Sequence, residues 1–393
     1  MAAAASDLRR IRVDQVGSLV NPQFLLDAFV ARDAGKLSDD QLAKAQDEAI
    51  VQSIAKQDAI GFPFVTDGEM RRRNFQDGFA DSVSGYERAQ TIAYHLGVSQ
   101  EPNARAEQNF AADGPAIVTR RGVVEKLKLV TNVPLNEFRF AQGHTRSPVK
   151  ATILSPDRIV QRFAYERSTD IYRDREAFLA DVVAIERKMI VELIEAGCRY
   201  IQIDAPGYTA YVDEVSLSRM RARGEDPARN LDMSIAADND LIRGFEGVLF
   251  GIHICRGNAR TRDPKTGRVA AQFHREGHYD AIAERLFTSL DHDRWLLEYD
   301  SERAGDFTPL GFFPKDRIVV LGVVTTKSSD VESKDDLRRR IDDAARFLPV
   351  EQLAISPQCG FGGLGHVTIT QDEQWRKMER LLEVAADVWR EQA

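Results

Sequence analysis

Short apolar runs alternate with longer amphipathic stretches along most of the chain. The runs are rich in Val, Ile and Leu and end in small or polar residues, which is typical of strands buried in a parallel sheet. Their brevity and their β-branched content favour strands over buried helices. We therefore predict eight strands, at residues 12–18, 64–69, 149–153, 200–204, 249–255, 295–298, 317–325 and 353–356.

The amphipathic stretches between these runs predict helices. Pro22 stands where the first would begin, and residues 38–41 form a capping-box pattern before the second. Strands that alternate with helices build a parallel sheet, and eight such units fit a TIM (β/α)8 barrel. An open doubly wound sheet is the alternative, but no Gly-x-Gly-x-x-Gly follows the first strand. The predicted helices cover residues 23–34, 38–60, 173–197, 229–245, 279–290, 332–347 and 372–391.

Residues 70–147 break this rhythm. A charged stretch is followed by two segments with polar faces, at 116–124 and 126–131, that are typical of antiparallel strands. We interpret 70–147 as an insertion or cap after the second strand of one TIM-barrel domain that covers residues 1–393. No internal repeat or low-complexity linker divides the chain.

Composition narrows the class of protein. Apolar residues make up 43% of the chain and charged residues 29%, as in an ordinary globular protein. The net charge of -8 argues against a nucleic-acid partner, and no apolar run is long enough to span a membrane. The first residues lack the apolar core of a secretory signal, and three cysteines are too few for a disulfide framework. We therefore expect a cytoplasmic protein.

The strand at 249–255 carries the most informative chemistry. It ends in His253 and Cys255, and residues two apart in a strand face the same side. Glu298 and Cys359 fall at the ends of two other predicted strands, and a TIM barrel gathers those ends on one face. Imidazole, thiolate and carboxylate are zinc ligands, so we predict a Zn²⁺ site. The alternative is a buried His beside a buried Cys in a metal-free core.

Other reactive side chains also follow predicted strands. Ser18, Glu69, Asp204 and Lys327 lie at or just past strand ends, where TIM-barrel active sites are built. Strand ends are also polar because they reach solvent, and that explanation suffices for any one of these residues. It does not explain why two of the three cysteines occur there.

In ordered combination, six segments resemble the cobalamin-independent methionine synthase family, specifically its catalytic C-terminal domain and its short single-barrel members. The resemblance extends from about residue 11 to residue 363. The segments are Val16-Gly-Ser-Leu, Asp67-Gly-Glu-Met-Arg-Arg, Ile201-Gln-Ile-Asp-Ala-Pro, His253-Ile-Cys, Leu297-Glu-Tyr-Asp-Ser and Ser356-Pro-Gln-Cys-Gly.

This resemblance implies roles for individual residues. Those that match the zinc ligands of the family are His253, Cys255, Glu298 and Cys359. The residues matching its homocysteine site are Ser18 at the carboxylate and Glu69 and Asp204 at the ammonium group. Two carboxylates facing a cation give charge-assisted hydrogen bonds, which makes this assignment physically reasonable.

The chain departs from the family on the side of the methyl donor. Pro156 stands near the position of a pterin-stacking Trp, and Ala205 replaces a carboxylate. Lys327 replaces a catalytic His, so a cation with a high reference pKa takes the place of a titratable imidazole. It would stabilise charge on a leaving group or pair with a nearby acid. Tyr208 and Arg256 would line a changed electrophile pocket, where Arg256 either binds an anionic substrate or is a solvated loop charge.

Three hypotheses follow. The first is a zinc-dependent thiol alkyltransferase, in which Lys327 and Asp204 are catalytic and a methyl group passes from 5-methyltetrahydrofolate or another donor to homocysteine. The second is zinc-dependent addition of a thiol cofactor to an epoxide or related electrophile. The third is a non-catalytic barrel that binds zinc or a thiol. All three have small-molecule partners, and the assembly state, monomer or homo-oligomer, stays open.

Overall fold

A parallel sheet forms the centre of the computed structural model, which describes residues 8–87, 120–262, 269–273, 275–362 and 369–389. Its six strands run in the spatial order β10-β9-β8-β5-β4-β3, and every neighbouring pair is parallel. Each corresponds to a strand predicted from an apolar run. The strands are β3 (Lys150–Leu154), β4 (Tyr200–Asp204), β5 (Leu249–Ile254), β8 (Arg294–Glu298), β9 (Ile318–Val324) and β10 (Leu353–Pro357).

The first two predicted strands extend this sheet at its edges as isolated bridges. Val13 pairs with Ile355 of β10, and Val65 pairs with Val149 beside β3. A backbone hydrogen bond also joins the two edge segments. The Leu19 N–H donates to the Gly68 carbonyl over 3.1 Å. The architecture is therefore of the predicted TIM-barrel type.

The side chain of Gln57 explains why the second edge segment is not a regular strand. Its amide nitrogen donates to the Thr66 carbonyl and its oxygen accepts the Thr66 N–H, each over 2.9 Å. The same oxygen accepts a hydrogen bond from the Gln15 side chain over 2.8 Å. A buried side-chain amide thus satisfies backbone groups that a neighbouring strand would otherwise pair.

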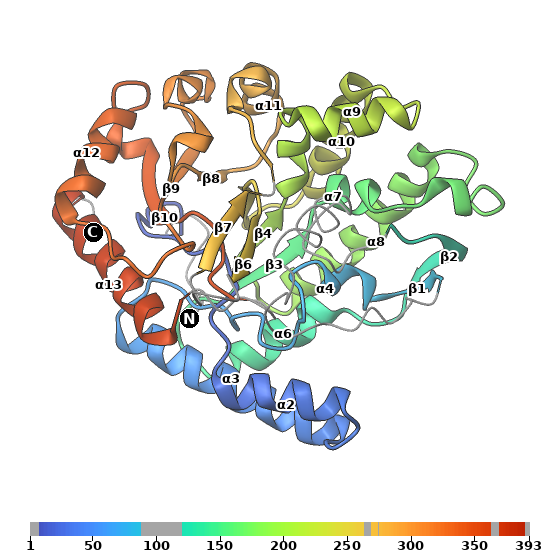
Figure 1. Cartoon of the computed structure of the whole chain (residues 1–393), viewed down its shortest axis with the longest axis horizontal. Helices are drawn as coiled ribbons and strands as arrows, with labels where there is room; N and C mark the ends of the chain where they lie inside the picture. Colours follow the sequence, from blue (N-terminus) through green and yellow to red (C-terminus); the bar gives the residue numbers. More distant parts are fainter. Residues whose placement is uncertain (1–7, 88–119, 263–268, 274, 363–368, 390–393) are drawn as a thin grey trace.

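Helices surround the sheet, with the strands gathered at the centre of the molecule (Figure 1). The predicted capping box of α3 is present, with Ser38 and Gln41 bonding each other's backbone N–H groups. Thr370 and Glu373 form a second capping box on α13. The helices matching predicted ones are α2 (Gln23–Asp33), α3 (Asp39–Ala59), α8 (Arg175–Glu195), α10 (Pro227–Ile242), α11 (Ala283–Ser289), α12 (Lys334–Ala344) and α13 (Gln371–Val388).

Shorter elements complete the described chain. The helices α7 (Pro156–Gln161) and α9 (Glu214–Ala222) follow β3 and β4, and an antiparallel pair joins β6 (Asn258–Arg262) to β7 (Val269–Phe273). None of the helices in the described ranges is long and apolar enough to cross a membrane. The 3-10 helices in the described ranges are η1 (Tyr165–Arg167), η2 (Pro206–Tyr211), η3 (Tyr279–Ala281), η4 (Glu302–Ala304), η5 (Thr308–Phe312) and η6 (Val350–Gln352).

The range 70–147 differs in detail from its sequence prediction. A single strand, β2 (Val123–Leu129), runs through the predicted break at residue 125 and pairs antiparallel with β1 (Val83–Tyr86). The short helix α4 (Asp77–Ala80) precedes β1. The helix α6 (Val133–Gln142) was not predicted, and it packs against β3 and α8. Predicted strand residues 116–119 lie outside the described residues.

Candidate metal centre

Three predicted ligands meet where β5 and β10 end. His253 lies in β5, Cys255 follows it, and Cys359 stands two residues after β10. Their donor atoms all lie within 4.8 Å of one another, and the two sulfurs are 3.7 Å apart. A disulfide would bring the sulfurs to about 2.05 Å. Two thiolates at about 2.3 Å from one tetrahedral Zn²⁺ stand about 3.8 Å apart, which matches the observed separation.

The surroundings of these residues also suit a metal. His253 is buried, and neither ring nitrogen has an oxygen or nitrogen partner among the residues that the structure describes. A buried polar group without a partner is costly, and a metal ligand is one way to satisfy it. Cys255 is buried and Cys359 is half-buried, so the group can be reached from one side.

Electrostatics prepare one sulfur for metal binding. A hydrogen bond with Cys359 and the nearby His253 ring hold the pKa of Cys255 well below its usual range, although burial opposes them. The pKa of Cys359 is raised by that same hydrogen bond and by burial. Burial lowers the pKa of His253, but the Cys255 sulfur outweighs it and raises the pKa overall. A thiolate beside an imidazole favours a divalent cation.

Glu298, the fourth predicted ligand, contacts cations of the protein. Its Oε1 atom lies 3.2 Å from the Lys327 ammonium and also contacts the Arg303 guanidinium, while Oε2 accepts the Arg256 N–H over 2.6 Å. These groups lower the Glu298 pKa, Lys327 most strongly, against the effect of burial. For Lys327 the structure shows the acid pairing that the sequence left open, and it adds Asp300 at 2.6 Å. The ligand role of Glu298 stays a prediction.

Glu69 and Asp204, the predicted ammonium-binding acids, are both buried. They interact electrostatically, since the pKa of Asp204 is raised to about 7 by burial and by the charge of Glu69. Burial also raises the pKa of Glu69. Glu69 adopts a φ of 56°, in the left-handed region where a non-glycine residue is strained. Its Oε1 accepts a hydrogen bond from Thr152 over 2.9 Å.

Ser18 lies beside the turn that carries Cys359. The Phe361 N–H donates to the Ser18 carbonyl over 2.9 Å. A Cβ atom added at Gly360 would stand 1.9 Å from the Ser18 hydroxyl oxygen, so only glycine allows this approach. The structure therefore brings the predicted carboxylate-binding residue next to a predicted metal ligand.

Tyr208 and Arg256 have contacts that the sequence did not predict. The Tyr208 hydroxyl donates to Asp238 of α10 over 2.5 Å, which gives it a partner within the protein, and its contact with substrate stays a prediction. Arg256 is buried, so it is not a solvated loop charge. Its Nε donates to the Gly277 carbonyl, and its guanidinium lies over the Tyr279 ring.

Sequence reasoning missed three residues around the predicted ammonium-binding acids: Arg72, Glu137 and Gln202. Arg72 bonds Glu137 of α6 through a buried ion pair and reaches Glu69 over 3.4 Å. The Gln202 side chain donates to Asp204 over 2.7 Å. Arg72 and Gln202 stood inside the quoted motifs Asp67-Gly-Glu-Met-Arg-Arg and Ile201-Gln-Ile-Asp-Ala-Pro, so their positions were the available signal.

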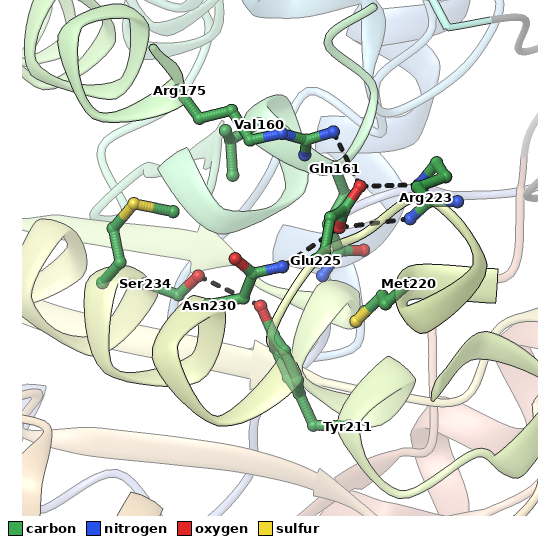
Figure 2. Close-up of a pocket in the computed structure, with 10 residues that line it drawn as sticks. Val160, Gln161, Arg175, Tyr211, Met220, Arg223, Glu225, Asn230 and Ser234 are labelled. Atoms are coloured by element: carbon green, nitrogen blue, oxygen red, sulfur yellow. Dashed lines mark hydrogen bonds and ion pairs between the residues drawn. The ribbon is translucent and has the colours of Figure 1, made fainter. Parts of the chain in front are cut away.

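A small cavity lies away from this centre, between α7, α9 and α10. It has room for about one water molecule, and none of the three clustered ligands lines it. Figure 2 shows Glu225 bonded to Arg175, Arg223 and Asn230 in its wall. These contacts satisfy the charge of Glu225 within the protein, which is consistent with a structural role.

Comparison with known proteins relates the whole chain to one family. The sequence matches the family described as "Cobalamin-independent synthase, Catalytic domain" over residues 15–239 and 278–386. It is 31% identical over 386 residues to the uncharacterized protein YxjH of Bacillus subtilis, covering 96% of this chain and 95% of that protein. It is 25% identical over 346 residues to a methionine synthase of Pyrococcus abyssi, covering 88% and 84%.

A solved structure shares the fold. The putative vitamin-B12-independent methionine synthase of Listeria monocytogenes superposes with a TM-score of 0.71 at 24% sequence identity. The superposition covers 99% of each chain, so it includes both the sheet and the segments around it.

Proposed function

Because the chain belongs to the cobalamin-independent methionine synthase family, a family of methyltransferases, we propose that it is a zinc-dependent enzyme that methylates homocysteine. The observation that carries this proposal is the cluster of His253, Cys255 and Cys359, with its sulfurs 3.7 Å apart. Three protein donors, with a fourth position kept for water or substrate, are typical of catalytic zinc.

The protein residues would divide the work between metal and substrate. His253, Cys255 and Cys359 would hold the ion, which when bound lowers the pKa of a thiol enough to make it a nucleophile at neutral pH. Glu69 and Asp204 would receive the ammonium group of homocysteine, and Ser18 would bind its carboxylate. Ser18 lies against the turn of Cys359, which supports placing the amino acid beside the metal.

Asp204 can also handle a proton. Its pKa of about 7 means that it exchanges a proton readily near neutral pH. We propose that it releases its proton to solvent as the substrate binds, and that the ammonium group then stabilises the resulting carboxylate. The Gln202 amide donates a hydrogen bond to Asp204 and so orients the Asp204 carboxyl group.

The methyl donor, or the way in which it is bound, would differ from that of the full-length enzymes. Pro156 begins α7 and cannot stack on a pterin ring, Ala205 has no charged group, and the Lys327 ammonium pairs with two acids. We therefore expect another methyl donor, or a folate bound in a different manner, and we expect Lys327 to stabilise charge near the donor.

Zinc content and product formation test this proposal together. Purified protein is expected to hold one Zn²⁺ per chain and to release protons when homocysteine is added at neutral pH. Methionine should then form with one of a panel of methyl donors that includes 5-methyltetrahydrofolate. The matched control is Cys198→Ser, a buried cysteine outside the cluster, whereas Cys359→Ser should lose zinc. A zinc-free protein whose Cys359→Ser variant behaves like the wild type would contradict the metal assignment.

The same assay separates the other hypotheses. Zinc with no response to homocysteine, but with consumption of an epoxide by another thiol, would replace methyl transfer with thiol addition. Zinc with no alkylated product from any donor would indicate a binding protein.

A further inference from the structure

Lys150 of β3 carries a fully buried ammonium group. It donates to Asp14 over 3.0 Å, to the Gln15 carbonyl, and to the side-chain oxygen of Gln202 over 2.7 Å. A lysine ammonium has three N–H donors and no acceptor, so each of its donors has a partner. These three contacts fix the position of the Lys150 nitrogen inside the sheet.

Gln202 lies between this ammonium and the predicted substrate site. Tyr200, Gln202 and Asp204 stand two residues apart in β4, so their side chains share one face of the sheet. The Gln202 side chain is fully buried, and its nitrogen donates to the Val16 carbonyl over 2.5 Å and to Asp204 over 2.7 Å. Val16 precedes Ser18 by two residues, so the amide contacts both segments that carry predicted amino-acid-binding groups.

The charge of Lys150 determines which end of the amide meets Asp204. Because an ammonium can only donate, the amide atom that faces it has to be the oxygen. The two N–H groups of the amide then point to the Val16 carbonyl and to Asp204, which accept them. Without Lys150, the buried Gln202 oxygen would lose this donor, and leaving a buried acceptor unsatisfied is costly.

We propose that Lys150 is a positioning residue for amino-acid binding, which holds the N–H groups of Gln202 toward Asp204 and so leaves the other Asp204 oxygen to the substrate ammonium. Lys150 itself does not touch the substrate in this arrangement. It sets how strongly the site prefers a thiol that carries an ammonium group. The inference rests on the proposed function in taking Asp204 as an ammonium-binding acid.

Two thiols measure the ammonium site separately from the rest of the substrate. 4-Mercaptobutyrate is homocysteine without its ammonium group, so the ratio of the two dissociation constants at neutral pH reports on that group alone. Calorimetric titration of the purified, zinc-loaded chain gives both constants. In Lys150→Met and in Gln202→Met the preference for homocysteine should fall roughly 10-fold, as for the loss of one charge-assisted hydrogen bond. The affinity for 4-mercaptobutyrate should stay the same, whereas a purely structural defect would weaken both thiols equally.

A double variant shows whether Lys150 acts through Gln202. If it does, Lys150→Met combined with Gln202→Met should lose no more preference than either single variant, because the two residues form one chain of contacts. Losses that multiply in the double variant would overturn the inference. Lys377→Met is the matched control, because Lys377 of α13 is also a fully buried lysine and pairs with Glu332 at 3.1 Å. It should keep the wild-type ratio.

Lys150→Met is expected to fold, because Asp14 keeps the Arg294 guanidinium and the Tyr200 hydroxyl as partners. If it does not fold, Lys150→Gln takes its place. An amide at this position can turn either a donor or an acceptor toward Gln202, so the preference for homocysteine should fall there too.

The two proposals fail differently in this experiment. A wild type that binds both thiols equally, or binds neither, overturns the ammonium site of the proposed function and this inference with it. A wild type that prefers homocysteine, with a preference that persists in the Lys150 variant, overturns this inference alone.

Discussion

Burial decides the protonation state of Asp238, whose side chain is hydrogen-bonded by two hydroxyl groups. Its carboxyl group accepts hydrogen bonds from the Tyr208 hydroxyl, over 2.5 Å, and from the Ser155 hydroxyl, over 2.9 Å. Burial raises its pKa from 3.8 to about 8, and the neighbouring charge of Asp157 acts in the same direction. The group is therefore protonated in the folded protein at neutral pH, where the unfolded chain would have released the proton.

This difference makes stability depend on pH. Between about pH 4 and pH 8 the unfolded chain binds fewer protons at this residue than the folded one, so stability falls as the pH rises. The isosteric variant Asp238→Asn cannot titrate and should lose this dependence. From about pH 5 to pH 8 its free energy of unfolding should improve relative to wild type by up to about 4 kcal/mol. Urea unfolding of both proteins at the two pH values measures their free energies of unfolding. If the variant differs from wild type by the same amount at both pH values, Asp238 does not titrate in this range.

At the residue scale, the sequence shows which metal-ligand side chains are present, but it shows less well how they are oriented. His253 and Cys255 could be predicted to share a face because strand geometry alternates side chains. The ion pairs around Glu298 could not, because they depend on the rotamers of Lys327 and Arg303, which chain position does not determine. The strain at Glu69 was hidden for a similar reason, since nothing in its residue type indicates a left-handed φ.

At the scale of elements, the turn after β10 is held in place by glycine. A Cβ at Gly360 would stand 1.9 Å from the Ser18 hydroxyl oxygen and 3.2 Å from the Ser18 Cβ, so Gly360→Ala must turn the Ser18 side chain away or push apart the turn of Cys359 and the segment of Ser18. We expect this variant to weaken zinc binding by roughly 10-fold or more, as displaced supporting groups do in metal sites. Titration of the apo-protein with Zn²⁺ against a competing chelator measures the effect.

Gly311→Ala is the matched control. Nothing lies within 4 Å of a Cβ built at Gly311, in η5, and its φ is not in the left-handed region. Its zinc affinity should equal that of wild type. Equal affinities for the Gly360 and Gly311 variants would show that the close approach of Ser18 does not position Cys359.

Most elements could be predicted because their apolar patterns are strong, and the exceptions have physical causes. The helix α6 was hidden inside a range interpreted as an insertion or cap, although Asn132 as N-cap and Pro134 in its first turn gave a helix-start signal. Missing this helix also concealed Glu137, the partner of Arg72. The second predicted strand is reduced to a bridge where Gln57 bonds the backbone of Thr66, a contact between residues that sequence periodicity does not report.

At the scale of the whole molecule, a buried ionic layer links the two edges of the sheet to its middle. Asp14, from the first edge segment, accepts hydrogen bonds from Lys150 of β3 over 3.0 Å and from Arg294 of β8 over 2.5 Å. All three side chains are fully buried. Lys150 also donates to Gln202 over 2.7 Å, and Gln202 in turn donates to Asp204. The layer therefore connects the interior of the sheet with the predicted substrate site.

Asp14→Asn should reveal what this layer contributes. The amide keeps the shape of the side chain but removes the negative charge, so Lys150 and Arg294 become buried cations without their shared anion. Removing one partner of a buried ion pair costs roughly 3–5 kcal/mol, and urea unfolding should show a loss of that order.

Asp335→Asn is the control, because Asp335 pairs with Arg338 while 93% exposed, and an exposed pair contributes less than about 1 kcal/mol. Similar losses in the two variants would mean that the buried layer adds no more than a surface ion pair. If the loss is large and Gln202 still orients Asp204 through its own bond, homocysteine-induced proton release should persist in the folded fraction of the Asp14 variant.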